Sequence, residues 1–356
     1  MTQMPPNFMS LLLAQKCSLR SAILAAGSAF PLALYAAPSI QTALGNPIAG
    51  ETIVLEGRDF TTMESSTISF FDNIENQSEY SDLSDGASAL IDSGPWQRKT
   101  SEWSSSLSIT RSEVDRSEKV SAMYEGTGRA YIGWPRALND AENKRLYVSW
   151  WFKPFQDPNQ FSGHNKFIRV WDSPDATQTR VAWNQRLLAG ESVTDTSWAP
   201  WNGLIGEWNR LEYFVDGVNG EVKAWTNGQL IHYVKEFTKN DIQDGLDIAL
   251  LGFDPNYGEP YKSFRFLIDD IYLSTSPARV ELSNSSVWTK QGMKRELQTV
   301  INWSNQEISF KYELGSLDQS KTIYAYVIDN QGLVNNNGFP IDACSKCPEP
   351  IGLTVD

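Results

Sequence analysis

The middle of the chain consists of short runs in which β-branched and aromatic residues recur, and each run ends near Gly, Asn, Asp or Pro. The clearest runs are residues 146–153, 165–171, 207–216, 221–226 and 265–275. Such runs are typical of β-strands, and no segment between them carries an apolar pattern long enough for a helix. The pattern therefore predicts an all-β protein whose core is an antiparallel β-sandwich.

Alternation within these runs assigns residues to the two faces of a strand, because successive side chains of a strand point to opposite sides. In the third run, Trp208, Arg210 and Glu212 share one face, whereas Leu211 and Tyr213 share the other. The first of these faces mixes an aromatic ring with charged groups, which suits contact with a sugar.

The two ends of the chain carry patterns that complete each other. Residues 38–60 contain a short strand, a Pro/Gly turn and an alternating strand, after which no further strand of that kind follows. Strands that would continue the pattern are predicted in 299–312 and 321–335. Together these segments resemble IPT/TIG-type immunoglobulin-like domains, although Arg58 and Asp59 stand where that family has a small residue and Gly.

This resemblance implies one immunoglobulin-like domain that a large inserted domain interrupts, because insertions are tolerated at exposed loops whose ends lie close together. Three consecutive β modules are the alternative, and both arrangements give an all-β chain. The predicted parts are an export signal at 1–36, an immunoglobulin-like domain formed by 38–62 and 283–343, a jelly roll at 64–282, and a C-terminal tail at 344–356.

The inserted segment resembles a known sandwich family in its central hairpins. The strand at 208–216, the strand at 221–225 and the Asn-Gly turn at 227–228 resemble the central hairpins of concanavalin A-like lectin/glucanase jelly rolls, which include LamG and polysaccharide-lyase types. The resemblance implies a curved jelly roll with a concave face on which relatives bind sugars. It does not by itself imply one activity, since a single fold hosts many functions.

Aromatic and arginine side chains on such a face would suit a glycan. Rings pack against the C–H surfaces of a sugar, and guanidinium groups hold carboxylates or sulfates. The alternative is that the tryptophans fill the core between the sheets and the arginines are ordinary surface residues. The predicted carbohydrate-binding residues are Arg169, Trp171, Arg180, Trp183 and Asn184 on strands or their ends, and Trp198 and Trp201 in a predicted loop at 194–203.

Four carboxylates form a second group of candidates. Asp72 and Glu75 belong to a Phe-Asp-x-x-Glu pattern in an early strand, and Asp269 and Asp270 lie in the Ile-Asp-Asp-Ile of a late strand. A carboxylate on an apolar face is costly unless it is paired or binds a cation, and oxygen ligands favour Ca²⁺. The sequence thus predicts a structural calcium site, with hydrogen bonds to backbone N–H groups or nearby arginines as the alternative.

Catalytic motifs are incomplete. No strand carries the paired carboxylates of a jelly-roll glucanase. Residues 111–116 and 229–232 resemble two motifs of jelly-roll alginate lyases, but Asp115 interrupts the first and Leu230 lengthens the second. A β-elimination needs a base and a group that neutralises the carboxylate of the substrate. The candidate catalytic residues are His232, His164, Tyr213 and Arg169, although a histidine within a strand often has only a structural role.

Composition narrows the location and the partners. The first 36 residues predict a cleaved export signal, because basic residues precede an apolar run and the small residues Ala36–Ala37 follow it. The apolar run is shorter than the roughly 20 residues that a membrane span needs. We therefore expect secretion and no membrane span afterwards. The formal net charge of −13, without a Lys/Arg-rich run, argues against nucleic acid as a partner. In an exported chain the nearby Cys344 and Cys347 favour a local disulfide over a redox or zinc site.

The sequence therefore favours an exported carbohydrate-binding protein that recognises a polysaccharide, including an anionic one, on the concave face or rim of a jelly roll. Two alternatives stay open. One is a polysaccharide lyase, favoured over a glycoside hydrolase, that uses the same groove. The other is a structural protein with cell-surface or matrix partners.

Overall fold

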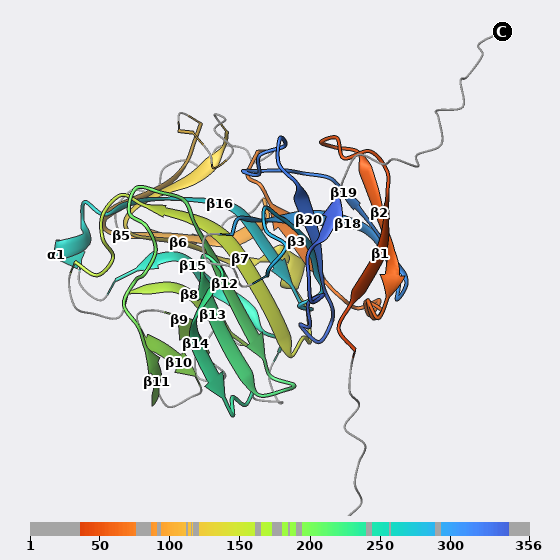
Figure 1. The fold of residues 1–356 in the computed structure, drawn as a ribbon. Coiled ribbons are helices and arrows are strands. Elements are labelled where there is room, and N and C mark those ends of the chain that lie inside the picture. The colour runs from red at the N-terminus through yellow and green to blue at the C-terminus, as the bar shows by residue number, and fades with distance from the viewer. Residues whose placement is uncertain are drawn as a thin grey trace, which may run out of the picture. The chain divides into compact units, whose positions relative to one another are not determined.

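The computed structural model describes part of the chain. The described residues are 36–341, apart from 76–86, 91–93, 112, 115, 117–120, 161–164, 173–179, 184–185, 190–193, 240–243, 256–257 and 289–292. Their regular secondary structure is β-strand apart from one 3₁₀ turn, η1 (Arg136–Leu138), and one short helix, α1 (Gly258–Tyr261). The prediction of an all-β, antiparallel fold is confirmed (Figure 1). No helix among these residues is long and apolar enough to cross a membrane.

One large antiparallel sheet contains the strands of the middle of the chain. Its strands follow the order β11-β10-β9-β8-β15-β6-β16-β7-β12-β13-β14, while β3 pairs with β16, and β5 pairs with β4 and β6. The strands are β3 (Ser69–Asp72), β4 (Ala87–Leu90), β5 (Trp96–Thr110), β6 (Met123–Pro135), β7 (Arg145–Pro154), β8 (Lys166–Trp171), β9 (Arg180–Trp183), β10 (Arg186–Ala189), β11 (Thr194–Trp198), β12 (Asn209–Asp216), β13 (Glu221–Thr226), β14 (Gln229–Lys235), β15 (Asp247–Asp254) and β16 (Arg265–Ser274).

This sheet curls over and buries its own inner side, as in a jelly-roll sandwich. Trp183 on β9 stacks on Tyr213 on β12, with ring centroids 6.3 Å apart, although many strands separate β9 from β12 in the sheet order. Trp150 on β7 meets the same Trp183 edge to face at 6.0 Å. Each buried ring of this kind contributes roughly 1.5–3 kcal/mol of hydrophobic stabilisation, so the aromatic residues of the central runs form the core.

A second antiparallel sheet combines strands from both ends of the described chain. Its order is β1-β2-β19-β18-β17-β20-β21, and Figure 1 shows the orange β1 and β2 beside the blue strands. Its strands are β1 (Ser39–Leu44), β2 (Thr52–Arg58), β17 (Arg279–Ser283), β18 (Arg295–Trp303), β19 (Glu307–Lys311), β20 (Ile323–Ile328) and β21 (Phe339–Ile341). The chain thus leaves this sheet after β2 and returns to it at β17. The predicted domain bounds stay a prediction. The IPT/TIG assignment stays a prediction.

The second sheet has a hydrophobic core of its own. Strand β18 serves two partners: its first half, Arg295–Gln298, pairs with β17, and Thr299–Trp303 pairs with β19. The strands on either side can therefore face each other across buried residues. Those residues include Ile53, Leu55, Phe60, Val280, Leu282, Ile308, Phe310, Leu317, Ile323, Ala325, Val327 and Ile341.

A buried charged network joins the two sheets. Arg210 and Glu212 on β12 point away from the jelly-roll core and are buried against residues of β17 and β18. The network members are Tyr147, Arg210, Glu212, Arg279, Glu281 and Arg295. The prediction that the face of Arg210 and Glu212 suits a sugar is therefore wrong, because the second sheet covers these side chains.

Candidate functional site

Several of the predicted site residues lie in the jelly-roll core. Trp183 is 3% exposed, Tyr213 0%, His232 1% and Trp201 8%. His232 meets the edge of Trp183, and Trp201 packs on Phe167 with centroids 5.3 Å apart. This burial gives the predicted sugar contacts of Trp183 and Trp201 no support, and they stay a prediction.

Two catalytic candidates are buried in the same core. Tyr213 and His232 lie behind the sheet, out of reach of a polymer. Burial also raises the pKa of the Tyr213 hydroxyl well above its ordinary value, so this group keeps its proton at neutral pH. A catalytic role for Tyr213 or His232 does not fit this position.

Other predicted residues are described only by their backbone, or not at all. Trp198 ends β11 and pairs with Arg186, so the predicted loop 194–203 begins as a strand. Arg180 begins β9 and pairs with Trp171. The residues that fall outside the described part of the chain are His164, Asn184, Cys344 and Cys347.

Arg169 belongs to a basic cluster that the sequence reasoning did not identify. The Asp254 carboxylate lies 2.7 Å from Arg129 Nε, 3.4 Å from Lys166 Nζ and 3.5 Å from Arg169 Nη1. The Asp254 side chain is 3% exposed, while the three cations are 12–19% exposed. The cluster therefore combines one buried carboxylate with three partly exposed cations.

The cluster lies on the side of the sheet that faces away from the core. On β6, Arg129 alternates with Ala130 and Ile132, which are buried in the core. This alternation was a visible signal in the sequence, but β6, β8 and β15 are far apart along the chain. Only their pairing in the sheet brings Arg129, Lys166 and Asp254 together.

Lys166 has an unusual protonation equilibrium. Burial lowers the pKa of its ammonium group to about 8, an effect that Asp254 opposes and the positive charge of Arg169 reinforces. Desolvation disfavours the charged form of a lysine. Lys166 can therefore gain or lose a proton close to neutral pH, which an ordinary surface lysine does not do.

Aromatic rings continue from the cluster along β8. The guanidinium group of Arg169 lies 5.9 Å from the ring of Trp171, and Trp171 meets Trp134 edge to face at 6.3 Å. Trp134 has a φ of 56°, a left-handed conformation that is a genuine outlier for a bulky residue. Such strained backbone is concentrated at functional sites. Arg129, at the other end, lies 5.9 Å from the ring of Tyr131.

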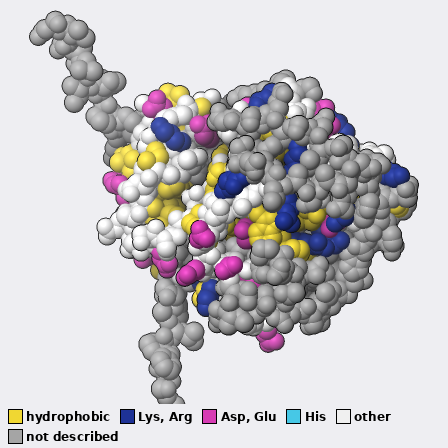
Figure 2. All heavy atoms as spheres, turned by 180° about the vertical axis from the view of Figure 1, so that it is seen from behind, with side chains coloured by type: hydrophobic (Ala, Val, Ile, Leu, Met, Phe, Trp, Pro, Cys, Tyr) yellow, Lys and Arg dark blue, Asp and Glu magenta, His cyan; other side chains and the backbone are white. Residues whose placement is uncertain are grey.

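A cavity of about 480 Å³ opens where β5, β6, β8 and β15 begin or end, beside Trp134. Its walls carry more acidic than basic groups, and they include Arg98, Asp172, Asp244 and Asp247. Burial raises the pKa of the Asp247 carboxyl to about 7, although the N–H of Ile248 donates to it at 2.6 Å and opposes the shift. Charge thus changes sign along the strands, from the basic cluster to this cavity. Figure 2 shows basic, acidic and hydrophobic side chains interspersed on one face of the molecule.

The four carboxylates proposed for calcium are held by the protein's own donors. Asp72 accepts the indole N–H of Trp96 at 2.7 Å and the backbone N–H of Ile74 at 3.0 Å. Asp270 pairs with Arg116, Glu75 accepts the N–H of Ala122, and Asp269 accepts the N–H of Asp270. Within the described ranges, no group of three or more acidic, His or Cys side chains could hold a metal ion. These contacts give the calcium site no support, and it stays a prediction.

Comparisons with known proteins show similarity of structure only. No family model matches the chain, and no curated protein matches it. Among solved structures, the cellulose induced protein Cip1 shares 16% identity at a TM-score of 0.36, with 48% of this chain and 86% of that chain covered. The endo-β-1,4-glucuronan lyase of Trichoderma reesei shares 12% identity at a TM-score of 0.34, with 50% of this chain and 90% of that chain covered. Arcelin-5, a lectin-like defence protein of Phaseolus vulgaris, shares 13% identity at a TM-score of 0.32, with 59% of this chain and 98% of that chain covered. Similarity at this level carries no inference about function.

Proposed function

We propose that this chain is an exported polysaccharide-binding protein, which holds an acidic polysaccharide against the outer side of β6, β15 and β8. The observation that carries the proposal is the group of Arg129, Lys166 and Arg169 around Asp254, in line with the rings of Trp171 and Trp134. Export rests on the predicted signal in the first 36 residues.

The charge of the cluster favours an anionic ligand. Three of these four groups are cations whose side chains are 12–19% exposed, whereas the Asp254 carboxylate is buried, in a chain whose formal net charge is −13. Arginine binds carboxylates and sulfates through paired N–H donors. A polymer of uronic acids or sulfated sugars supplies such groups at regular intervals.

The rings supply the second component of polysaccharide recognition. Trp171 lies next to Arg169 and against Trp134, so a ring follows the guanidinium group along β8. Aromatic side chains bury the apolar face of a ligand while their neighbours bond its polar groups. The acidic cavity beyond Trp134 repels an anionic sugar, so we expect the charged units of the ligand to lie at the Asp254 end.

Calorimetric titration tests this proposal. We expect polygalacturonate and alginate to bind and a neutral glucan not to bind at the cluster. Removing one charge-assisted contact by Arg169→Ala should weaken polyuronate binding about 10- to 100-fold. Lys321→Ala, which removes an exposed cation in the bend before β20, is the matched control. Equal affinities of the Arg169 and Lys321 variants would overturn the proposal.

A polysaccharide lyase is the second candidate, and the pKa of Lys166 favours it. In its neutral form Lys166 could take the proton next to a uronate carboxylate while Arg169 neutralises that carboxylate. The electron pair then forms a C=C bond, the C–O bond to the leaving sugar breaks, and the leaving oxygen takes up a proton.

Absorbance near 235 nm distinguishes the two candidates, because elimination produces an unsaturated uronate. A lyase would raise this absorbance when incubated with polyuronates, and Lys166→Met would abolish the rise while Arg129 and Arg169 still hold the polymer, with the weaker affinity that loss of one positive charge gives. Binding without any rise would leave the protein a binding protein alone.

A further inference from the structure

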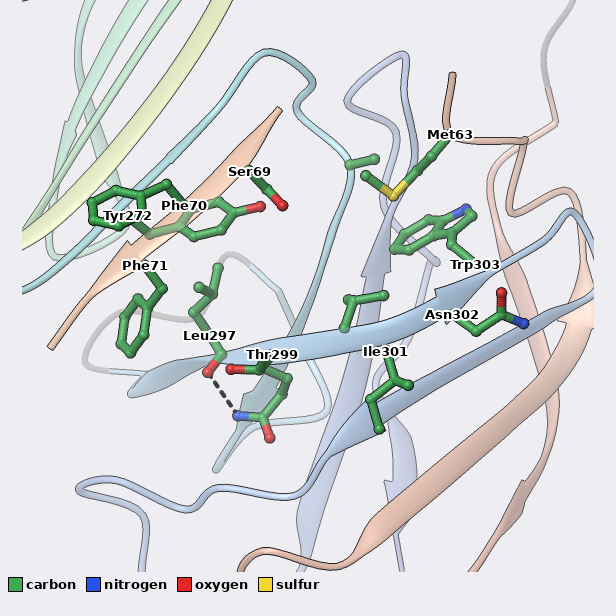
Figure 3. A pocket seen from close by; sticks show the side chains of 13 residues that line it. Met63, Ser69, Phe70, Phe71, Tyr272, Leu297, Thr299, Ile301, Asn302 and Trp303 are labelled. Carbon is green, nitrogen blue, oxygen red and sulfur yellow. Dashed lines mark hydrogen bonds between the residues drawn. The ribbon is translucent and has the colours of Figure 1, made fainter. Parts of the chain in front are cut away.

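A groove lies between β3 and β18, remote in sequence from the basic cluster. It encloses about 390 Å³, within the range of small-ligand sites. Phe70 and Phe71 on β3 and Tyr272 on β16 line one side, and residues of β18 up to Trp303 line the other. Figure 3 shows Phe71 and Tyr272 on one side of the groove and Trp303 on the other, with Thr299 and Ile301 between them. We call it the β3–β18 groove.

The β3–β18 groove contains no charged residue. Its lining has no Asp, Glu, Lys, Arg or His, although the chain as a whole is strongly acidic. Burial raises the pKa of Tyr272 above its ordinary value, so this hydroxyl is also uncharged at neutral pH. A charged ligand would lose hydration here without gaining a partner, which is unfavourable. The groove therefore selects uncharged ligands.

Its walls are fixed before any ligand binds. The indole N–H of Trp303 donates to the carbonyls of Phe60 at 3.2 Å and Thr61 at 3.0 Å, which sets the position of the ring. Gln298 donates to the carbonyl of Glu313 at 2.8 Å and accepts its N–H at 2.9 Å, which holds β18 in place. A preformed wall lowers the entropic cost of binding.

The same walls combine exposed apolar surface with available polar groups. Phe71 is 38% exposed and Ile301 55%. Ser69, Thr299 and Asn302 also line the groove, and their side chains make no hydrogen bond with the residues that the structure describes. Two hydroxyl groups and an amide beside aromatic rings match the alternation of C–H faces and hydroxyls on a sugar. A purely apolar partner would leave these three polar groups without hydrogen bonds, which is costly.

We propose that the β3–β18 groove is a second carbohydrate site, one that binds a neutral glycan. It differs from the proposed polyuronate site in its strands and in its charge, and it does not depend on that proposal. A protein with both sites would hold an acidic and a neutral polysaccharide together, and two linked sites in one protein bind more tightly than either alone when the ligand reaches both.

Titration with neutral hexasaccharides of β-1,4-glucose, β-1,3-glucose, β-1,4-mannose and β-1,4-xylose tests the second site. We expect at least one to bind and to change the tryptophan fluorescence of the protein, to which Trp303 contributes from the wall of the groove. Phe71→Ala and Thr299→Val should each weaken this binding about tenfold, whereas polyuronate binding stays as in the wild type. Val218→Ala removes another exposed apolar side chain, 60% exposed on a turn of the jelly roll, and should change neither.

Three results would overturn the proposal. One is that none of the four hexasaccharides binds to the wild-type protein. Another is that Phe71→Ala and Thr299→Val bind the hexasaccharide as the Val218→Ala control does. The third is that an oligogalacturonate displaces the neutral sugar, since an uncharged groove should not accept it. Thermal unfolding of each variant separates loss of binding from loss of folding.

Discussion

Arg210 on β12 and Glu281 on β17 form a bidentate ion pair between the two sheets. Nη1 of Arg210 donates to Oε2 of Glu281 and Nη2 donates to Oε1, each at 3.0 Å. Arg210 is 4% exposed and Glu281 0%. Arg279 and Arg295 also contact Glu281. Because the partners lie on separate sheets, this pair fixes the position of one sheet against the other.

Removing the charge of Glu281 should destabilise the protein strongly. Glu281→Gln leaves Arg210, Arg279 and Arg295 buried around a neutral group, and breaking a buried pair on one side costs about 3–5 kcal/mol. Urea denaturation measures this loss in the free energy of unfolding. Glu56→Gln, at an exposed position of β2, should change it by less than about 0.5 kcal/mol. Equal stability of the two variants would show that the network does not hold the sheets together.

The Glu281 carboxylate should also make the stability of the protein decrease at acidic pH. Burial alone would raise the pKa of Glu281, but Arg210, Arg295 and Arg279 hold it well below its usual value of 4.5. A lowered pKa stabilises the folded state above pH 4.5, and that stabilisation is lost as the pH falls toward the folded-state pKa. We expect the melting temperature of the wild type to fall below about pH 4.5, and that of Glu281→Gln to fall less steeply.

Asp247 should have the opposite effect on stability. Its pKa rises from 3.8 to about 7 on folding, so the folded state holds a proton that the unfolded state loses between these values. Stability is therefore lost as the pH rises from about 4 to 7. Asp247→Asn, which keeps an acceptor for the N–H of Ile248, should stabilise the protein at pH 8 by about 2–4 kcal/mol and have little effect at pH 4. Melting curves at the two pH values check this, and a variant that is less stable at pH 8 contradicts it.

Polyuronate binding should weaken as the pH rises through 8. Lys166, with a pKa of about 8, is charged below this value and neutral above it, so the cluster that it forms with Arg129, Arg169 and Asp254 loses one positive charge. Calorimetric titrations at pH 7 and 9 measure the change. Lys166→Arg keeps its charge at both values, so its affinity should not depend on pH in this range. A wild-type affinity that is the same at both pH values would place Lys166 outside the binding site.

Chelation should leave the stability unchanged. Asp72 accepts the indole N–H of Trp96, and Asp270 pairs with Arg116, so both carboxylates already have partners without a metal ion. We expect equal melting temperatures in EDTA and in millimolar CaCl₂. A clear rise of the melting temperature with calcium would instead support the calcium site predicted from the sequence.

Alternation in the sequence was sufficient to predict the strands and the residues that share a face. Leu211 and Tyr213 do lie together in the core, and Arg210 and Glu212 lie together on the other side. Alternation does not show what covers each face, because a strand pattern carries no information about its neighbours in space. Arg210 is therefore buried by strands from the far end of the chain.

For the same reason, the sequence did not show which candidate site residues are exposed and which are buried. Trp171 and Trp183 lie in similar patterns, yet one contacts Arg169 on the outer side and the other stacks on Tyr213 in the core. The register between β8 and β15, which is shifted at irregular positions, decides that Lys166 meets Asp254. Register depends on contacts between distant segments, so the sequence alone did not identify this cluster.

The pairing of β2 with β19 also bears on how the protein is made. Glu56 pairs with Glu307, so the partner of β2 is synthesised 307 − 56 = 251 residues later. At about 5–20 residues per second, the nascent chain carries an unpaired edge on β2 for roughly 10–50 s. The inserted jelly roll can fold during that interval and bring the ends of its chain together. The first strands made are thus among the last to reach their final place.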